Sequence, residues 1–270
     1  MTNIYKNMSE DVFSGIERLY GTKAYSVIKN MHVCVVGIGG VGSWVVEALV
    51  RSAVGKITLI DFDTIESSNI NRQIHALNST VNAKKCSVIL ERVKDINPDC
   101  EVTIIDDFIT LENMATYLSG NEIPRNYDYV VDAIDSIKFK AGLIYYCKRN
   151  KIPVVTTGGA GGLTDPSVIE VADLSKTYND ALAAKVRSTL RDQYNFTRNP
   201  KRSFRVDCVF SSQQQLYPKD DGSVSHEKPG IHGVSLDCRF GYGAASFVTG
   251  TFGFIAAAHI IQKHVKKNLS

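Results

Sequence analysis

The strongest constraint on the fold is a glycine-rich turn between a run of β-branched residues and an amphipathic segment. The run HVCVVG (32–37) has the composition of a buried strand, and residues 43–55 have helical character. The turn follows the pattern G-x-G-x-x-G, matched by Gly37, Gly39 and Gly42. Its backbone amides can surround a phosphate, because no side chain blocks the approach and the following helix begins with partial positive charge. The sequence therefore predicts a Rossmann-type nucleotide site.

Strands and helices continue to alternate after this turn. Strand-like runs cover 56–61, 101–106, 127–134 and 152–159, and helices are expected over 17–30, 82–96 and 137–150. Parallel strands need a crossover between them, usually a helix, so this alternation indicates a parallel sheet. We expect an α/β fold with a Rossmann-like, doubly wound, mainly parallel sheet and helices on both of its faces.

The chain is expected to form one domain with four parts. These are a helical arm (1–30), a nucleotide-binding core (31–175), a polar and basic insertion (176–230) and an apolar segment that packs on the core (231–270). Residues 240–262 carry no formal charge and are long enough to span a bilayer. Because glycine, serine and threonine lower the hydrophobicity of this stretch, a helix buried against the sheet is favoured over a membrane contact.

Composition excludes several classes of protein. With 44% hydrophobic and 22% charged residues the chain is globular, and a net charge of +3 over 270 residues is too small to attract nucleic acid by itself. The six cysteines form no CxxC pair, so no zinc site is expected. The first residues, MTNIYKNMSEDV, lack the apolar core of a signal peptide, and a reducing, cytoplasmic setting is expected.

Polar residues beyond the turn distinguish between nucleotides. Asp61 ends the second strand and can accept hydrogen bonds from ribose hydroxyls, but this motif alone fits an NAD-dependent oxidoreductase equally well. The cations Arg72 and Lys85 favour the higher charge of a triphosphate. Asp135 follows a later strand, where it could hold Mg²⁺ or cap the next helix. Taken together, these residues favour ATP.

The strings GIGGVGS, LIDFDTIESSNINRQ, KK and DAIDS, in this order, resemble the adenylating domains of the ubiquitin-activating-enzyme superfamily. The resemblance covers Met31 to about Asp173 and implies ATP and Mg²⁺ as cofactors. It implies an ATP site composed of Gly37, Gly39, Gly40, Gly42, Asp61, Asp63, Asn69, Arg72, Lys85 and Asp135. Of these, Arg72, Lys85 and Asp135 would be catalytic, with Asp135 as the Mg²⁺ ligand.

The same resemblance implies a homodimer. In this superfamily an arginine of an N-terminal helix often reaches the triphosphate bound by the other subunit, and Arg18 is the matching candidate. The surrounding sequence, FSGIERLYG, departs from the usual aromatic-x-Arg arrangement.

Further strings, including NRQIHAL, RNKIPVVTTGGAGG, DALAAK and VDCVFS, resemble the branch that dehydrates threonylcarbamoyladenosine in tRNA. This branch implies adenylation of the substrate carboxylate, then intramolecular ring closure beside the anticodon. Such a reaction needs no thioester cysteine, which leaves the roles of Cys208 and Cys238 open. Two alternatives remain: an adenylyltransferase for the C-terminus of a small sulfur-carrier protein, and an NAD-dependent oxidoreductase. A sulfur-transfer or cysteine-desulfurase-type protein is a further candidate partner.

Two other segments are candidate binding sites. The basic segment 185–205 is interleaved with aromatic residues that could stack on bases, although a solvated lobe explains it equally well. Its candidate RNA-binding residues are Arg198, Lys201, Arg202 and Arg205. The turn TTGGAGG (156–162) could let its backbone approach a ligand or a monovalent cation, or it only shapes the strand exit.

Overall fold

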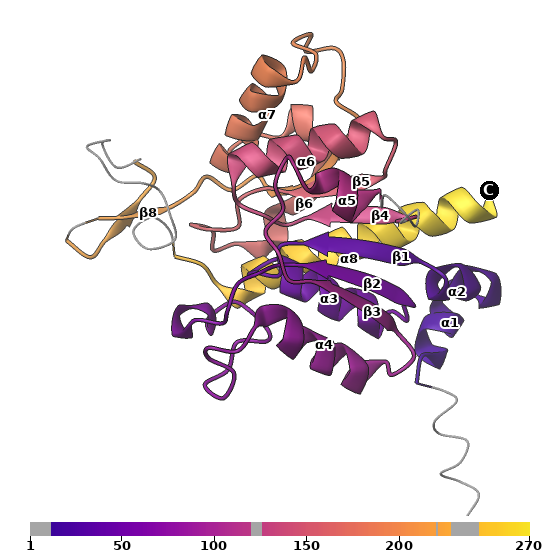
Figure 1. Ribbon diagram of the computed structural model, residues 1–270. Coiled ribbons are helices and arrows are strands. Elements are labelled where there is room, and N and C mark those ends of the chain that lie inside the picture. The colour runs from indigo at the N-terminus through magenta and orange to yellow at the C-terminus, as the bar shows by residue number, and fades with distance from the viewer. Residues whose placement is uncertain (1–11, 120–125, 220, 228–242) are drawn as a thin grey trace, which may run out of the picture.

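A seven-stranded sheet forms the centre of the computed structural model, which describes residues 12–119, 126–219, 221–227 and 243–270. The strand order is β3-β2-β1-β4-β5-β7-β6, and only β6 runs antiparallel to its neighbour, β7 (Figure 1). The strands are β1 (His32–Val36), β2 (Lys56–Ile60), β3 (Glu101–Ile105), β4 (Tyr129–Asp132), β5 (Val154–Thr157), β6 (Ile169–Asp173) and β7 (Asp207–Ser211). The predicted doubly wound, mainly parallel sheet is confirmed.

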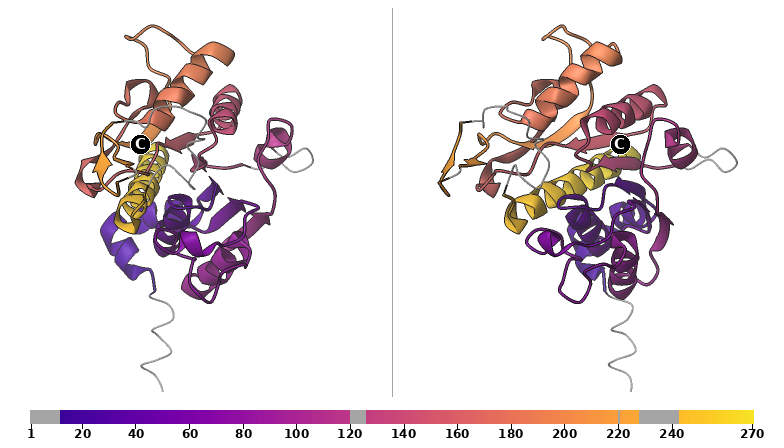
Figure 2. Two further views of the ribbon diagram at one scale, coloured as in Figure 1. Left: turned by 90° about the vertical axis from the view of Figure 1, so that its left-hand side faces the viewer. Right: turned by 60° about the vertical axis from the view of Figure 1, so that its left-hand side comes forward.

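Helices cover both faces of the sheet, because its central strands are apolar on both sides. In β1, Val33 and Val35 join the core beneath one face, and Cys34 and Val36 join the core beneath the other. On the first face lie α3 (Gly42–Arg51), α4 (Lys85–Ile96) and α8 (Ser246–Leu269), and on the second lie α5 (Met114–Leu118), α6 (Ile137–Arg149) and α7 (Ala181–Gln193). Figure 2 shows this arrangement from two further sides, with α6 and α7 above the sheet and α3 and α4 below it.

The C-terminal helix α8 packs closely along α3, and two glycines of α8 lie against Trp44 of α3. A Cβ at Gly253 would lie 2.6 Å from Trp44 Cβ, and one at Gly250 would lie 3.5 Å from the Trp44 ring. Gly250 and Gly253 therefore let the two helices approach closely. In the described part of the chain no helix is both long and apolar enough to cross a membrane.

The N-terminal helical segment is divided at Gly21, whose φ of 82° ends one helix and starts the next. The single helix predicted over 17–30 is thus two helices, α1 (Ser14–Tyr20) and α2 (Thr22–Lys29). The end of α2 packs beside the start of β2, where a Cβ at Gly55 would lie 1.9 Å from Lys29 O.

Shorter elements complete the chain. They are the 3₁₀ turns η1 (Ser67–Asn69), η2 (Pro166–Val168) and η3 (Leu174–Lys176), and a two-stranded ribbon of β8 (Tyr217–Pro218) and β9 (Val224–Ser225). Residues 176–230, where the sequence pattern weakens, supply α7 and also β7, which lies within the sheet. The division of the chain into four parts stays a prediction.

Candidate nucleotide site

A cleft of about 1050 Å³ lies at the carboxyl ends of the parallel strands, where the strand order reverses between β1 and β4. The lining includes most of the residues that the sequence singled out: Gly37, Gly39, Gly40, Asp61, Asp63, Asn69, Arg72, Lys85 and Asp135. Gly42, Arg18 and the four basic residues of segment 198–205 are not part of it. The fold thus brings nine predicted residues from four separate chain segments into one hollow.

The glycines of the turn serve the packing of the turn as well as the lining of the cleft. Gly37 has a φ of 87°, and a Cβ there would meet Ile134 Cγ2 at 2.9 Å. A Cβ at Gly42 would lie 1.8 Å from Gly37 O, so Gly42 allows α3 to start directly against the turn. The first and last glycines of the motif therefore position the loop, and Gly39 and Gly40 face the cleft.

Asp61 fixes the shape of the cleft through two backbone amides. Its Oδ2 accepts from Ile38 N at 2.6 Å and its Oδ1 accepts from Asp63 N at 2.9 Å. Each carboxylate oxygen has a second lone pair, so Asp61 can still accept from a ligand hydroxyl. The carboxylate predicted to bind ribose thus also ties the glycine turn to the end of β2.

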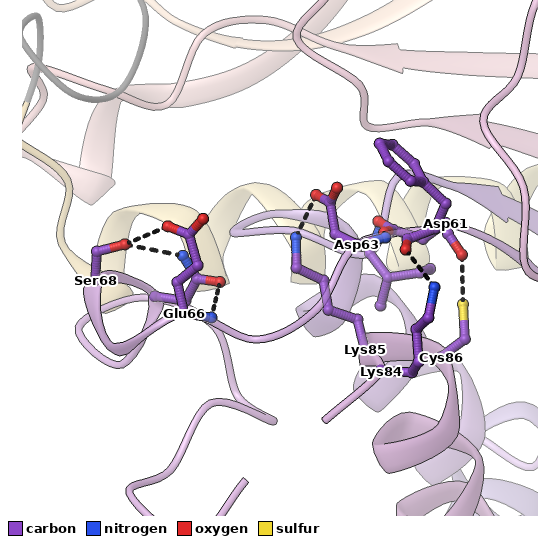
Figure 3. Close-up of polar contacts among 10 residues, drawn as sticks. Asp61, Asp63, Glu66, Ser68, Lys84, Lys85 and Cys86 are labelled. Atoms are coloured by element: carbon purple, nitrogen blue, oxygen red, sulfur yellow. Dashed lines mark hydrogen bonds and ion pairs between the residues drawn. The ribbon is translucent and has the colours of Figure 1, made fainter. Parts of the chain in front are cut away.

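The cations reach the cleft from two directions. Lys85, at the start of α4, has a side chain only 8% exposed and pairs with Asp63 at 2.7 Å. Figure 3 shows Lys85 pointing toward Asp63 and Lys84 pointing in another direction. Lys84 Nζ donates to Phe62 O at 2.8 Å and to Asp106 Oδ1 at 3.0 Å. Of the adjacent lysines, only Lys85 lines the cleft.

Arg72 is half-buried on the opposite wall. Its Nη1 donates to Ser68 O at 2.7 Å. Its own carbonyl accepts from Trp44 Nε1 at 3.0 Å and from Thr249 Oγ1 at 3.2 Å. Asn69 Oδ1 accepts from Glu66 N at 3.2 Å and so shapes η1, the turn that precedes Arg72. Side chains from α3 and α8 thus fix the backbone that carries this cation.

Asp135 stands on a turn anchored by a buried ion pair. Lys140 Nζ lies 3.1 Å from Asp132 Oδ1, and the two side chains are 2% and 0% exposed. Lys140 also donates to Ile134 O at 2.9 Å, directly before Asp135, and Thr156 donates to Asp132 Oδ2 at 2.6 Å. Burial raises the pKa of Asp132, and the charge of Lys140 opposes that rise. The N-cap residue of α6 is Ser136, which leaves the Asp135 carboxylate to face the cleft.

Sequence reasoning missed several residues of the cleft. Gln73 is 6% exposed, and its Oε1 has no hydrogen-bond partner among the described residues. Its position beside Arg72 in the string NINRQ was the available signal. The rings of Phe62 and Phe108 meet edge to face at 5.3 Å and supply an aromatic wall. Gln215 and Thr249 come from distant segments without a recognisable motif.

Arg18 lies far from the cleft of its own chain. It is exposed on α1, and α1 and α2 lie beside the ends where the strands begin (Figure 1). The cleft is at the opposite edge of the sheet, so an Arg18 that contributes to a site has to reach a second copy of the chain.

The aromatic residues of segment 185–205 pack inward. Tyr194 stacks on Tyr145 at 4.6 Å, and Phe196 meets the buried Phe204 edge to face at 4.9 Å. Phe204 is buried and the other two rings are half-buried, so these contacts limit stacking on bases, and RNA binding by this segment stays a prediction. The four basic residues Arg198, Lys201, Arg202 and Arg205 are exposed on the connection between α7 and β7, where Arg198 pairs with Asp192.

The turn 156–162 packs against the start of α7, and Cys208 is buried within the sheet. Gly159 N donates to Asp180 Oδ2 at 3.0 Å, and a Cβ at Gly158 would lie 1.8 Å from the same oxygen. Cys208 is fully buried in β7, which raises the pKa of its thiol and disfavours the reactive thiolate. Cys238 lies outside the described residues. Within the described ranges, no group of three His, Cys, Asp or Glu side chains could hold a metal ion.

A doubly wound sheet with a glycine turn, two cations and a strand-end carboxylate around one cleft defines a nucleotide-binding protein of the adenylating type. The chain belongs to the ThiF family, whose model matches residues 15–270. It is 53% identical over 258 residues to the tRNA threonylcarbamoyladenosine dehydratase of Haemophilus influenzae, which covers 96% of this chain and 95% of the relative. The Escherichia coli protein of the same name is 51% identical over 94% of each chain. A crystal structure of the E. coli enzyme in complex with ATP has a TM-score of 0.83 at 48% identity and covers 95% of both chains.

Proposed function

We propose that this protein uses ATP to adenylate the carboxylate of threonylcarbamoyladenosine in tRNA and then closes a ring with net loss of water. The main support for this proposal is the cleft, in which Arg72, Lys85 and Asp135 surround a glycine turn. The chain is also similar over 95% of its length to a dehydratase crystallised with ATP. An NAD-dependent oxidoreductase is not favoured, because it does not explain these charged residues.

ATP fits the residues of the cleft. Amides of the turn from Gly37 to Gly40 would cradle phosphate, and Asp61 would accept from the ribose hydroxyls. The aromatic wall of Phe62 and Phe108 matches a purine ring.

The protein contributes mainly electrostatic stabilisation. Attack of the substrate carboxylate on the α-phosphorus gives an acyl-adenylate and releases pyrophosphate. Arg72 and Lys85 would stabilise the negative charge that develops on the phosphates. Asp135 would hold Mg²⁺, directly or through water, and a bound Mg²⁺ supplies further charge neutralisation. The turn 156–162 stays a candidate site for a monovalent cation.

Ring closure needs no protein nucleophile. An atom of the substrate's own carbamoyl side chain attacks the activated carboxyl carbon, and AMP leaves. Intramolecular attack of this kind has a high effective molarity, so orientation by the cleft supplies much of the rate. The burial of Cys208 agrees with a route that lacks a thioester.

The function is tested by mass spectrometry of tRNA nucleosides after incubation with enzyme and ATP. We expect threonylcarbamoyladenosine to lose one water, with release of AMP and pyrophosphate. Asp135→Ala should abolish this turnover and keep the fold, whereas Asp99→Ala, an exposed carboxylate outside the cleft, should not change it. An unchanged nucleoside, together with pyrophosphate exchange that depends on a sulfur-carrier protein, would support the alternative adenylyltransferase.

We also propose a homodimer in which Arg18 completes the partner's site. A mixture of Arg18→Ala and Asp135→Ala subunits tests this, because each heterodimer would contain one intact site. After random exchange, we expect about a quarter of the wild-type activity, since half the dimers are mixed and each has one of two sites intact. Activity no higher than that of the separate variants would exclude action in trans. A cytoplasmic setting and a sulfur-transfer partner stay predictions.

A further inference from the structure

A second hollow of about 450 Å³ adjoins the nucleotide cleft. Its polar lining comes from the start of α7 and the segment 214–226, and it includes Asn179, Arg187, Gln214, Gln215 and His226. Ala181 and Gln215 line both spaces. A ligand in the second hollow is therefore a direct neighbour of a ligand in the cleft.

Charge divides the nucleotide cleft into two parts. All its charged side chains come from the segments after β1–β4 and from α4: Asp61, Asp63, Glu66, Arg72, Lys85, Asp107 and Asp135. The part formed by 157–161, 181–182 and Gln215 contributes none. Since the phosphates of ATP need the cations, the uncharged part is where the second substrate approaches, and the second hollow lies directly beyond it.

Arg187 is the cation of this second hollow. Ala181, Ala184 and Arg187 share one face of α7 through their spacing of three, and all three line the hollow. The guanidinium is half-buried and donates to the Thr177 hydroxyl. Among the described residues this is the one partner of the guanidinium, so four of its five N–H groups stay available in a site that is partly shielded from solvent.

No carboxylate forms an ion pair with Arg187 within the described ranges. Asp180 lines the same hollow, but its Oδ1 accepts from Ala183 N at 2.8 Å and its Oδ2 from Gly159 N at 3.0 Å. A half-buried cation without an ion-pair partner is a favourable place for an anionic ligand.

We propose that Arg187 anchors a backbone phosphate of the tRNA substrate in this hollow. The proposal rests on the proposed function: the substrate carboxylate is consumed in the cleft, and phosphodiesters are the other anions that the substrate carries. A phosphate anchored in this hollow, next to the modified nucleotide, directs the side chain of that nucleotide past Gly159 and Gln215 toward the bound ATP.

This site is separate from the exposed basic residues 198–205. Those residues follow the C-terminal end of α7 at Gln193, about 9 Å along the helix axis from Arg187 at 1.5 Å per residue, and they do not line the hollow. Arg187 would therefore contact the nucleotide nearest the reaction, and residues 198–205 would contact a neighbouring part of the tRNA.

The test compares Arg187→Gln with Arg149→Gln in the full-length protein. Arg149 is exposed near the C-terminal end of α6, outside both hollows, so its loss removes the same charge from a neighbouring helix. The measurements are binding of unmodified and modified tRNA over a range of KCl concentrations, steady-state turnover, and ATP affinity by calorimetry.

We expect Arg187→Gln to weaken tRNA binding roughly 10-fold, to reduce the slope of log K against log salt by about one, and to keep ATP affinity. Arg187→Lys should keep the salt slope, which separates loss of charge from misfolding. Unchanged tRNA binding, weaker binding with an unchanged slope, or an equal effect of Arg149→Gln would each overturn the proposal. Because tRNA binding is measured separately from turnover, the two proposals can fail independently. A wild-type protein that fails to dehydrate the nucleoside refutes the proposed function, and the binding comparison still tests the role of Arg187.

Discussion

Replacement of Lys140 by methionine is expected to destabilise the fold strongly. Methionine fits the apolar length of the lysine side chain but removes the charge that compensates Asp132. Both side chains are at least 98% buried, so solvent cannot replace the missing partner. Removal of one partner from a buried ion pair costs about 3–5 kcal/mol, and here three oxygens lose the same donor.

The effect should depend on pH in a defined direction. Burial already raises the pKa of Asp132, and loss of the opposing Lys140 charge raises it further. The unfolded carboxyl titrates near its ordinary value of 3.8, so the folded variant binds more protons than the unfolded one above that pH. Stability of Lys140→Met should therefore fall as pH rises from about 4 toward neutrality.

Urea unfolding of wild type and variant between pH 4 and 8 measures both quantities. The double variant Lys140→Met, Asp132→Asn should recover at least half of the lost stability at pH 7, because the remaining polar group is neutral. A loss below about 1 kcal/mol at pH 7, or a loss that grows on acidification, would refute the reasoning. Lys140 also holds Ile134 O beside Asp135, so any folded variant should show a reduced kcat with little change in ATP affinity.

Three further changes test other parts of the structure. Gly42→Ala places a Cβ 1.8 Å from Gly37 O, so ATP affinity measured by calorimetry should fall at least about 10-fold, and wild-type affinity would contradict the packing. A hydrogen bond from His259 is the main cause that lowers the pKa of Asp207 to about 2. Asp207→Asn should therefore lower the free energy of unfolding by about 2 kcal/mol at pH 7. Urea titrations should show this difference between variant and wild type vanishing as pH falls from 4 to 2. Burial lowers the pKa of His75 to about 4, so between pH 6.5 and 4 the unfolded chain binds a proton that the folded chain does not. The free energy of unfolding of the wild type should therefore fall by about 3 kcal/mol as pH falls through this window. A His75→Phe variant whose unfolding free energy has the same pH dependence would contradict this prediction.

Sequence patterns predicted those parts of the fold that depend on residues close together in the chain. The alternation of β-branched runs and helical segments was enough for the parallel sheet, because parallel strands require crossovers. The glycine turn, Asp61 and Asp135 were found for a related reason: each follows a strand, and the carboxyl ends of parallel strands meet at one edge. Arg72 and Lys85 were found through their residue type and through resemblance.

The remaining features depend on contacts that no local pattern encodes. Strand β7 enters the sheet antiparallel to β6, although it follows the polar segment that ends α7. Gln215 and Thr249 line the cleft from segments far along the chain. The ring packing of Tyr194, Phe196 and Phe204 shows the same limit, because their charged neighbours in sequence gave no sign of their apolar neighbours in space.

The hydrogen bond from Thr249 to the Arg72 carbonyl also sets an order of events during synthesis. The two residues are 177 positions apart, and a ribosome that adds 5–20 residues per second needs about 10–35 s to cover this distance. Until α8 has emerged, the backbone that carries Arg72 lacks this support and the face of α3 that packs against α8 is uncovered. A nascent or truncated chain should therefore expose apolar surface to chaperones and proteases and bind ATP poorly, so that nucleotide binding reports a completed chain.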